Sequence, residues 1–237
     1  MTLKIRVCCT LLWNGRTLVK GKAFAADRPV GHPLQAINVF QMREVDEIIF
    51  LDVTATKEGR RPDFKLIESL ARECFVPLTV GGGVKSVDDV RDLLRAGADK
   101  VSIRSAATPQ LCEDVASTYG RQVLVCCFEF GDSSDGGVSA AVAIDALSQW
   151  GVGEVLCQWR DGDGQMNGYH CPTVEWTARL NSVPVIASGG CGSYEHMAQA
   201  IDAGASAVAA GAMWLFTEQT PLEAKKYLAA KGYPVRL

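Results

Sequence analysis

Two glycine pairs in this chain are placed where they could bind phosphate. The segment 77–86 reads PLTVGGGVKS and the segment 184–193 reads PVIASGGCGS, so a similar apolar run ends on glycines in both halves. Glycine lets backbone N–H groups approach an anion closely, and the amino end of a following helix favours negative charge. Tight turns also need glycine, but a symmetric pair favours a shared binding role. We predict phosphate-binding turns at Gly82, Gly83, Gly189 and Gly190.

The next apolar run of each half ends on residues that could complete such a site. In the first half an arginine and a serine follow the run, and in the second half two small residues follow it. A guanidinium adds a full positive charge and can bind phosphate through two parallel hydrogen bonds. Two such sites suit an anionic small-molecule substrate with a phosphate at each end. The residues predicted to complete them are Arg104, Ser105, Gly211 and Ala212.

Two carboxylates also follow apolar runs. Asp52 ends the run EIIFLD, and Asp161 follows the run EVLCQW in a glycine-rich loop. A half-buried acid with a raised pKa can act as a general acid or base near neutral pH. We predict Asp52 and Asp161 as catalytic residues; the alternative is that each carboxylate only caps a turn of its own loop.

Three further charges stand at the beginnings of apolar runs. Glu47, Lys100 and Glu154 each precede a strand-like segment, so in a parallel sheet they would gather at the edge opposite the glycine pairs. They form either a solvated, paired rim or a gated entrance to the interior of the fold.

Alternating strand and helix patterns position all these residues. Short, almost continuously apolar runs indicate strands buried on both faces, as in a parallel sheet. Strands are predicted at 4–11, 47–52, 77–80, 100–103, 122–128, 154–157, 183–187 and 207–210. Helices are predicted at 33–44, 63–74, from 86, from 109, and at 140–150, 172–180, 194–203 and 221–231, with loops at 12–32 and 160–170.

Eight strand–helix pairs in two similar halves predict one closed α/β domain over residues 1–237. We expect a (βα)8 TIM barrel built from two (βα)4 halves, with its chemistry at the carboxyl ends of the strands. An open, doubly wound sheet is the alternative, but it would not explain the twofold repeat.

Composition excludes several classes of protein. The net charge of −3 argues against a nucleic-acid or membrane-surface partner, and no apolar run is long enough to cross a membrane. The amino-terminal residues show no signal-peptide pattern, so a cytoplasmic location is expected. The nine cysteines include no CxxC pair, and the three histidines have no metal-ligand spacing. We therefore expect reduced, mostly structural thiols, no metal and no cofactor.

The chain resembles the cyclase subunit of imidazole glycerol phosphate synthase, a (βα)8 barrel that uses ammonia from a glutamine amidotransferase. The resemblance implies phosphate at the two predicted sites and a glutamine amidotransferase subunit as partner. It also implies a charged ammonia gate at the amino ends of the strands, formed by Glu47, Lys100 and Glu154 with Arg6 as fourth member. The match is densest at 47–56, 77–84, 95–103 and 184–190.

The chain departs from this family at the positions of its two acids. The acid at the end of the first strand is replaced by Leu11, and the acid at the end of the fifth strand by Phe128. Glu129 comes one residue later, and neighbouring strand residues point to opposite faces, so Glu129 is expected to point away unless the strand bulges.

Segments 10–12, 42–47 and 55–62 look more like a paralogous branch linked to acetamidino-sugar formation in surface polysaccharides. The resemblance therefore implies an ammonia-using synthase subunit that acts on a phosphorylated or nucleotide-linked sugar. One alternative is an authentic imidazole glycerol phosphate synthase cyclase of histidine biosynthesis. The other is a barrel that has lost its chemistry and activates an amidotransferase as a scaffold.

Overall fold

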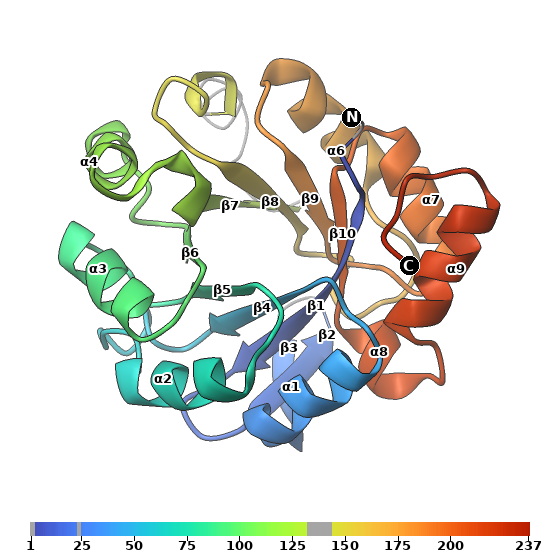
Figure 1. Cartoon of the computed structure of the whole chain (residues 1–237), viewed down its shortest axis with the longest axis horizontal. Coiled ribbons are helices and arrows are strands. Elements are labelled where there is room, and N and C mark those ends of the chain that lie inside the picture. The colour runs from blue at the N-terminus through green and yellow to red at the C-terminus, as the bar shows by residue number, and fades with distance from the viewer. Residues whose placement is uncertain (1–2, 23–24, 132–143) are drawn as a thin grey trace.

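A closed barrel of parallel strands forms the centre of the molecule (Figure 1). The structure, a computed structural model, describes residues 3–22, 25–131 and 144–237. Within these residues eight parallel strands follow one another in chain order, and the last pairs with the first, so the sheet closes as predicted. The barrel strands are β1 (Arg6–Trp13), β4 (Glu47–Asp52), β5 (Leu78–Gly81), β6 (Lys100–Ile103), β7 (Leu124–Phe130), β8 (Glu154–Trp159), β9 (Val185–Ser188) and β10 (Ala207–Ala210).

Helices surround the barrel, and the two halves begin equivalent helices in the same way (Figure 1). Ser86 caps α3 by accepting a hydrogen bond from the Asp89 N–H, and Ser193 caps α7 by accepting one from the His196 N–H. The helices of the described residues include α1 (Pro33–Met42), α2 (Phe64–Glu73), α3 (Val87–Arg95), α4 (Pro109–Tyr119), α6 (Cys171–Leu180), α7 (Tyr194–Asp202), α8 (Ala212–Phe216) and α9 (Pro221–Ala230), with a short 3-10 turn η1 (Arg121–Val123).

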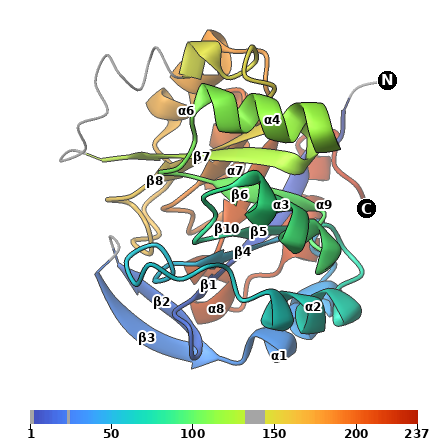
Figure 2. The same cartoon turned by 90° about the vertical axis from the view of Figure 1, so that its left-hand side faces the viewer.

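The predicted loop at 12–32 is wrong, because this segment contains a hairpin. Strand β1 runs on to Trp13, and β2 (Leu18–Lys22) turns back antiparallel to it before β3 (Ala25–Gly31). The Asn14 side-chain oxygen accepts hydrogen bonds from two following N–H groups, and Gly15 takes a φ of +86°. Asn-Gly is a typical hairpin signal that the loop prediction ignored. Figure 2 shows the hairpin at the end of the barrel away from both chain termini.

The β7 strand lies at 124–130 and not at the predicted 122–128, because η1 occupies 121–123. Of the predicted helix at 140–150, the first residues lie outside the described residues. Ile144 and Leu147 are buried in the core.

The barrel strands separate two apolar clusters, because successive side chains of a strand point to opposite faces of the barrel wall. The smaller cluster draws residues from strands alone, so it lies inside the barrel; it contains Cys8, Ile49, Val125, Leu156, Ile186, Ala207 and Ala209. The larger cluster includes helix residues and fills the layer between strands and helices. Leu11 of β1 and Phe128 of β7 belong to that outer layer. Their neighbours Leu12 and Glu129 therefore face the barrel interior.

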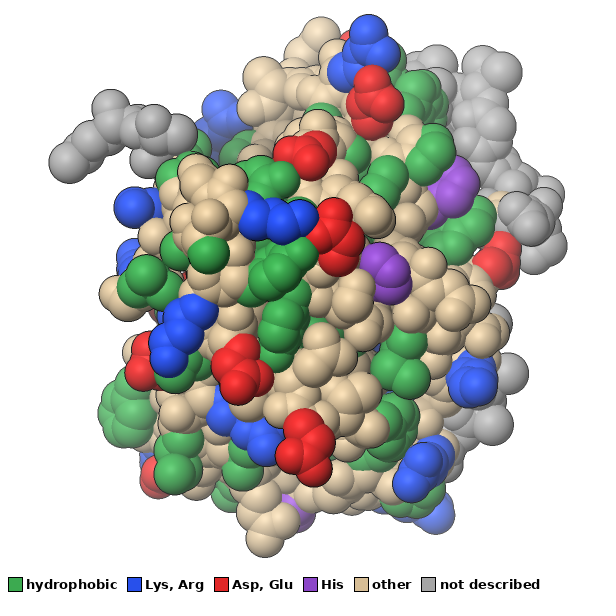
Figure 3. Space-filling view, turned by 90° about the vertical axis from the view of Figure 1, so that its right-hand side faces the viewer, with side chains coloured by type: hydrophobic (Ala, Val, Ile, Leu, Met, Phe, Trp, Pro, Cys, Tyr) green, Lys and Arg blue, Asp and Glu red, His purple; other side chains and the backbone are tan. Residues whose placement is uncertain are grey.

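Charged side chains are spread over the side of the molecule on which α7 and α9 lie (Figure 3). Basic and acidic groups alternate on it, so this face offers no single-sign patch for a polyanion. Within the described part of the chain, no helix combines the length and apolar character needed to cross a membrane.

A buried ion pair ties the last helix to the barrel. The Lys225 ammonium of α9 lies 3.3 Å from one Asp46 oxygen, and the other oxygen accepts a hydrogen bond of 2.8 Å from the Val7 N–H. Both side chains are only 4% and 6% exposed, so water cannot replace either partner.

We predict that Lys225→Met lowers the free energy of unfolding by about 3 to 5 kcal/mol, because Asp46 keeps its charge without its cation. The matched control is Lys226→Met, whose side chain is exposed on the same helix and should change stability by less than about 0.5 kcal/mol. Urea unfolding measures the change in the free energy of unfolding for each of the two variants. Equal losses would show that Lys225 does not anchor the helix.

Candidate functional site

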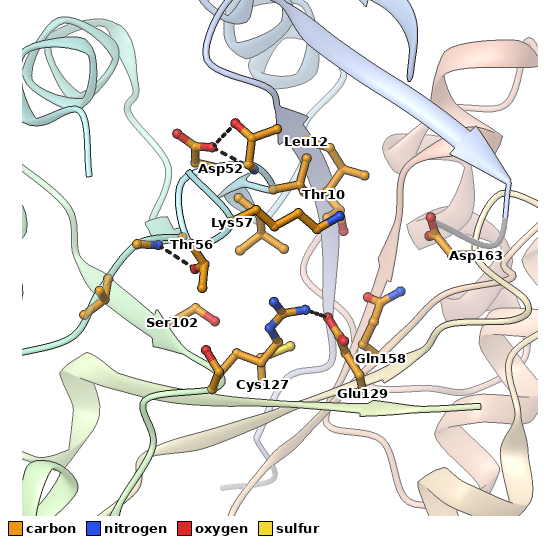
Figure 4. A pocket seen from close by; sticks show the side chains of 18 of the residues that line it. Thr10, Leu12, Asp52, Thr56, Lys57, Ser102, Cys127, Glu129, Gln158 and Asp163 are labelled. Atoms are coloured by element: carbon orange, nitrogen blue, oxygen red, sulfur yellow. Dashed lines mark hydrogen bonds and ion pairs between the residues drawn. The ribbon is translucent and has the colours of Figure 1, made fainter. Parts of the chain in front are cut away.

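A cavity of about 240 Å³ opens at the carboxyl ends of the strands. Residues from β1, β4, β6, β7 and β8 reach it, together with the loops that follow (Figure 4). Its wall is mixed, because apolar Leu12 and Leu51 alternate around it with charged and hydroxyl groups. This is the end of a parallel barrel at which ligands normally bind.

The first predicted phosphate turn opens onto this cavity. Gly82 and Gly83 line it with φ values of +106° and +74°, and Arg104 and Ser105 line it from the neighbouring strand end. A Cβ atom on Gly82 would lie 2.2 Å from the Asp52 carbonyl oxygen, so only glycine fits there. All four residues predicted for this site are therefore brought together.

The second predicted turn is packed differently. Gly189 and Gly190 have φ values of +89° and +96°, so the backbone repeats the first turn. However, the Gly190 carbonyl accepts a 2.8 Å hydrogen bond from the Gly168 N–H, and a Cβ on Gly189 would meet the Trp159 carbonyl at 2.3 Å. The loop after β8 lies against this turn. The four residues predicted for the second site do not line the cavity; they are Gly189, Gly190, Gly211 and Ala212.

Asp52 lines the cavity, but its carboxylate is fully engaged by its own loop. One oxygen accepts from the Ala55 N–H at 2.9 Å and the Thr54 N–H at 3.1 Å. The other oxygen lies 3.1 Å from the Arg60 guanidinium. Asp52 therefore orders the loop after β4, as in the alternative we gave it.

Asp163, and not Asp161, brings the carboxylate of the β8 loop into the cavity. Asp163 is buried and forms a 2.7 Å ion pair with Lys20 of β2, whose side chain is 3% exposed. Asp161 lies beside Arg160, 3.6 Å from its guanidinium, and is not among the residues that line the cavity. Sequence reasoning missed Lys20 because its segment was read as a loop.

Glu129 faces the cavity, which corrects the expectation that it points away. Strands β1 and β7 each run two residues further than predicted, and their inward positions are Thr10 and Leu12 on β1 and Cys127 and Glu129 on β7, one residue beyond those assigned from the sequence. No bulge is needed, because Cys127 and Glu129 are on the same face of one regular strand. The Glu129 carboxylate forms an ion pair with Arg104, shown in Figure 4 as a dashed line to Glu129.

Uncharged polar groups also line the cavity, among them Cys127 and Thr10. Burial raises the pKa of the Cys127 thiol to about 12, with Glu129 adding to the rise and Arg104 opposing it, so this thiol stays protonated at neutral pH. The Thr10 hydroxyl is buried and has no hydrogen-bond partner among the described residues. It can therefore serve a ligand. Within the described ranges, no three potential ligands gather to hold a metal ion.

The charges at the amino ends of the strands form a closed ring. Arg6 contacts Glu47 at 2.6 Å and Glu154 at 2.8 Å, and Lys100 contacts the same two carboxylates at 2.9 and 3.0 Å. The Thr79 hydroxyl donates a 2.6 Å hydrogen bond to the second Glu47 oxygen. All four predicted gate residues are thus in contact, with each cation between two anions.

Because the ring is partly buried, its four charged side chains depend on one another for stability. The Glu47 side chain is fully buried, whereas Arg6 and Lys100 are 25% and 16% exposed. Burial alone would lower the pKa of Arg6, but the nearby carboxylates outweigh it and raise the pKa above its usual value. Removing one partner would leave an uncompensated charge at the base of the barrel.

Comparison with known proteins places the chain among enzymes of one pathway. Residues 7–220 match the family described as "Histidine biosynthesis protein". The chain is 38% identical over 256 aligned residues to the imidazole glycerol phosphate synthase subunit HisF of Thermobifida fusca, and the match covers 100% of both chains. It is 39% identical over 252 residues to the subunits of the same name from Streptomyces avermitilis and Streptomyces coelicolor, again over the whole of each chain.

We predict that Gly82→Ala closes the first phosphate turn. The Cβ clash and the positive φ should cost about 3 kcal/mol of stability, and loss of one charged hydrogen bond should weaken phosphate binding about tenfold. Gly59→Ala is the control, because Gly59 has a φ of +67° but nothing within 4 Å of its Cβ position. That variant should lose only about 1 kcal/mol and keep phosphate affinity. Titration with inorganic phosphate and urea unfolding measure both, and unchanged affinity in Gly82→Ala would exclude this turn as the anion site.

Proposed function

The chain belongs to the histidine biosynthesis protein family, and we propose that it is the ammonia-using cyclase subunit of an imidazole glycerol phosphate synthase. The observation that carries the proposal is the pairing of two sites along one barrel. A closed ring of charges lies at its amino end, and a cavity lined by the glycine turn Gly82–Gly83 lies at its carboxyl end. This arrangement supports entry of a small nitrogen source at one end and its use at the other.

Ammonia would pass from the ring to the cavity through the barrel interior. Behind the ring lie the side chains of the inner cluster, several of them as small as Cys8, Ala207 and Ala209. A neutral molecule can cross such an apolar layer, whereas an ammonium ion would have to shed its water. The paired ring therefore suits a gate that opens when a partner rearranges its ion pairs.

In the cavity, the anionic end of the substrate would lie on the first turn beside Arg104. Of the cavity carboxylates in the described structure, Asp52 is held by its loop and Asp163 by buried Lys20. Among the described residues Glu129 forms an ion pair only with the half-exposed Arg104, so we assign the proton transfers to Glu129. Asp52 keeps an indirect role because it holds the loop after β4 in place.

The amino end of the barrel also offers a surface for the glutamine amidotransferase. Met42 ends α1 just before β4, and Phe75 lies between α2 and β5. Leu3 precedes β1, and Leu237 follows Val235, which pairs with Ile5. These side chains are 85%, 86%, 80% and 71% exposed, respectively, around the charged ring. Exposed apolar groups next to a gate favour a protein partner that would cover both.

A second candidate is the sugar-modifying branch, in which ammonia forms an acetamidino group. One observation favours it: the inward end of β1 carries Leu12, so the described cavity has no second unlocked carboxylate opposite Glu129. The whole-chain similarity to three imidazole glycerol phosphate synthase subunits supports the first candidate more strongly.

Genetic complementation tests the proposed function. The chain, expressed with the amidotransferase subunit from its own genome, should restore growth without histidine to a bacterial strain deleted for its own cyclase subunit. Growth would exclude a barrel that only activates its partner. A folded, partner-bound chain that fails to restore growth would overturn the proposal in favour of the second candidate.

We predict that Glu129→Gln lowers kcat for ammonia-dependent synthesis by about 10²- to 10⁴-fold, because it removes the proton-transferring group. Glu113→Gln is the control, since Glu113 is exposed on α4 away from the cavity, and its rate should not change. Steady-state assays with ammonium chloride as nitrogen source compare the two. A Glu129→Gln rate within threefold of the parent would remove Glu129 from the mechanism.

We predict that Phe75→Asp raises the dissociation constant for the amidotransferase by about tenfold or more, because an aromatic anchor is lost from the interface. Phe216→Asp is the control, because this partly exposed phenylalanine ends α8 at the opposite end of the barrel. Calorimetry measures both, and equal affinities in the two variants would place the partner elsewhere.

A further inference from the structure

We propose that Arg104 is an exchangeable partner that couples anion binding to the release of Glu129. In the structure Arg104 is paired with Glu129. When a phosphate group lies on the first turn, Arg104 turns to it, and Glu129 is left unpaired beside the ligand. This inference rests on the proposed function, because it assigns Glu129 and the first turn to one reaction.

The strand register places Arg104 between its two alternative partners, which are a phosphate group on the first turn and the Glu129 carboxylate. Gly81 of β5 pairs with Ser102 of β6, so Gly83 and Arg104 lie level at the ends of neighbouring strands. Ile103 pairs with Cys126 of β7, so Glu129 stands on the other side of Arg104. Gly83, Arg104 and Glu129 all line the same cavity. A change of side-chain rotamer is therefore enough to move the guanidinium from one to the other.

The present pair is weak enough to be exchanged. The Arg104 and Glu129 side chains are 44% and 24% exposed, so water screens their attraction. Forming an exposed ion pair changes the equilibrium constant between the paired and unpaired states by only about 1.5- to 5-fold. A phosphate group carries about −1.5 to −2 charges and three acceptor oxygens, and it binds a guanidinium through two parallel hydrogen bonds. The phosphate is therefore the stronger partner for Arg104.

The other cavity carboxylates cannot be released in this way. Asp163 is paired with Lys20, and those side chains are only 11% and 3% exposed. Asp52 accepts two backbone hydrogen bonds that no ligand can displace without unfolding the loop. Glu129 alone among these three would become free to accept a proton when the anion is bound. The exchange thus keeps the carboxylate neutralised until the substrate is in place.

Calorimetric titration with two probes tests the exchange, using inorganic phosphate and imidazole glycerol phosphate. The informative variant is Glu129→Asp, which keeps the charge but shortens the side chain, so that it no longer pairs with Arg104. We expect Glu129→Asp to bind both probes about two- to fivefold more tightly than the parent. We expect Arg104→Gln to bind them at least tenfold more weakly, and adding Glu129→Asp to Arg104→Gln to change nothing further.

The outcomes separate this inference from the proposed function. The exchange is overturned if Glu129→Asp changes probe affinity equally in the parent and in Arg104→Gln, or changes it in neither. This holds even if imidazole glycerol phosphate binds. Coupling seen with phosphate while imidazole glycerol phosphate fails to bind supports the exchange and counts against the proposed function. Binding of neither probe to the folded parent overturns both. Thermal unfolding of each variant confirms that it is folded before titration.

Discussion

The hydrogen-bond register of the closed parallel barrel determines which side chains meet in this protein. Each strand turns every second residue inward, and closure between β10 and β1 leaves no freedom to shift a strand by one residue. On β1 the inward positions begin at Arg6 and end at Leu12; on β7 they end at Glu129. A one-residue slip would put Leu11 and Phe128 into the cavity and send charged groups into the apolar layer beneath the helices.

This register produces three layers of different character along the barrel axis. At the amino end, opposite charges meet in a ring, because four inward positions on different strands carry two cations and two carboxylates. The middle layer is apolar, and above it hydroxyl, thiol and amide groups lead to the cavity. Buried charges are tolerated only at the two ends, where each has a partner. The polar ends and the apolar middle are what a gate, a passage for a neutral molecule and a reaction chamber require.

The sequence was sufficient for the fold, for the first glycine turn and for the charges at the strand starts. Continuous apolar runs and the repeated glycine turns predicted the barrel. Glu47, Lys100 and Glu154 were found because charges at strand starts must gather at one edge, whereas Arg6 was added through the family resemblance. The cavity was harder, because its chemistry depends on where each strand ends. Placing the inward acid positions at Leu11 and Phe128 shifted the inward face of β1 and β7 by one residue, and it made Glu129 look misplaced. Lys20 was missed because only tertiary packing against Asp163 distinguishes it from a surface lysine. The covering of the second glycine turn by the β8 loop follows from loop packing, which no periodicity encodes.

We propose that this barrel incorporates ammonia at its carboxyl end. The most direct measurement supplies ¹⁵N-ammonium chloride to the purified chain, without an amidotransferase, together with the substrate of imidazole glycerol phosphate synthase. Mass spectrometry then follows the isotope. We expect ¹⁵N in newly formed imidazole glycerol phosphate, at a rate that rises with the concentration of free ammonia. Absence of labelled product, under conditions in which the Thermobifida fusca relative forms it, would show that the barrel does not incorporate ammonia.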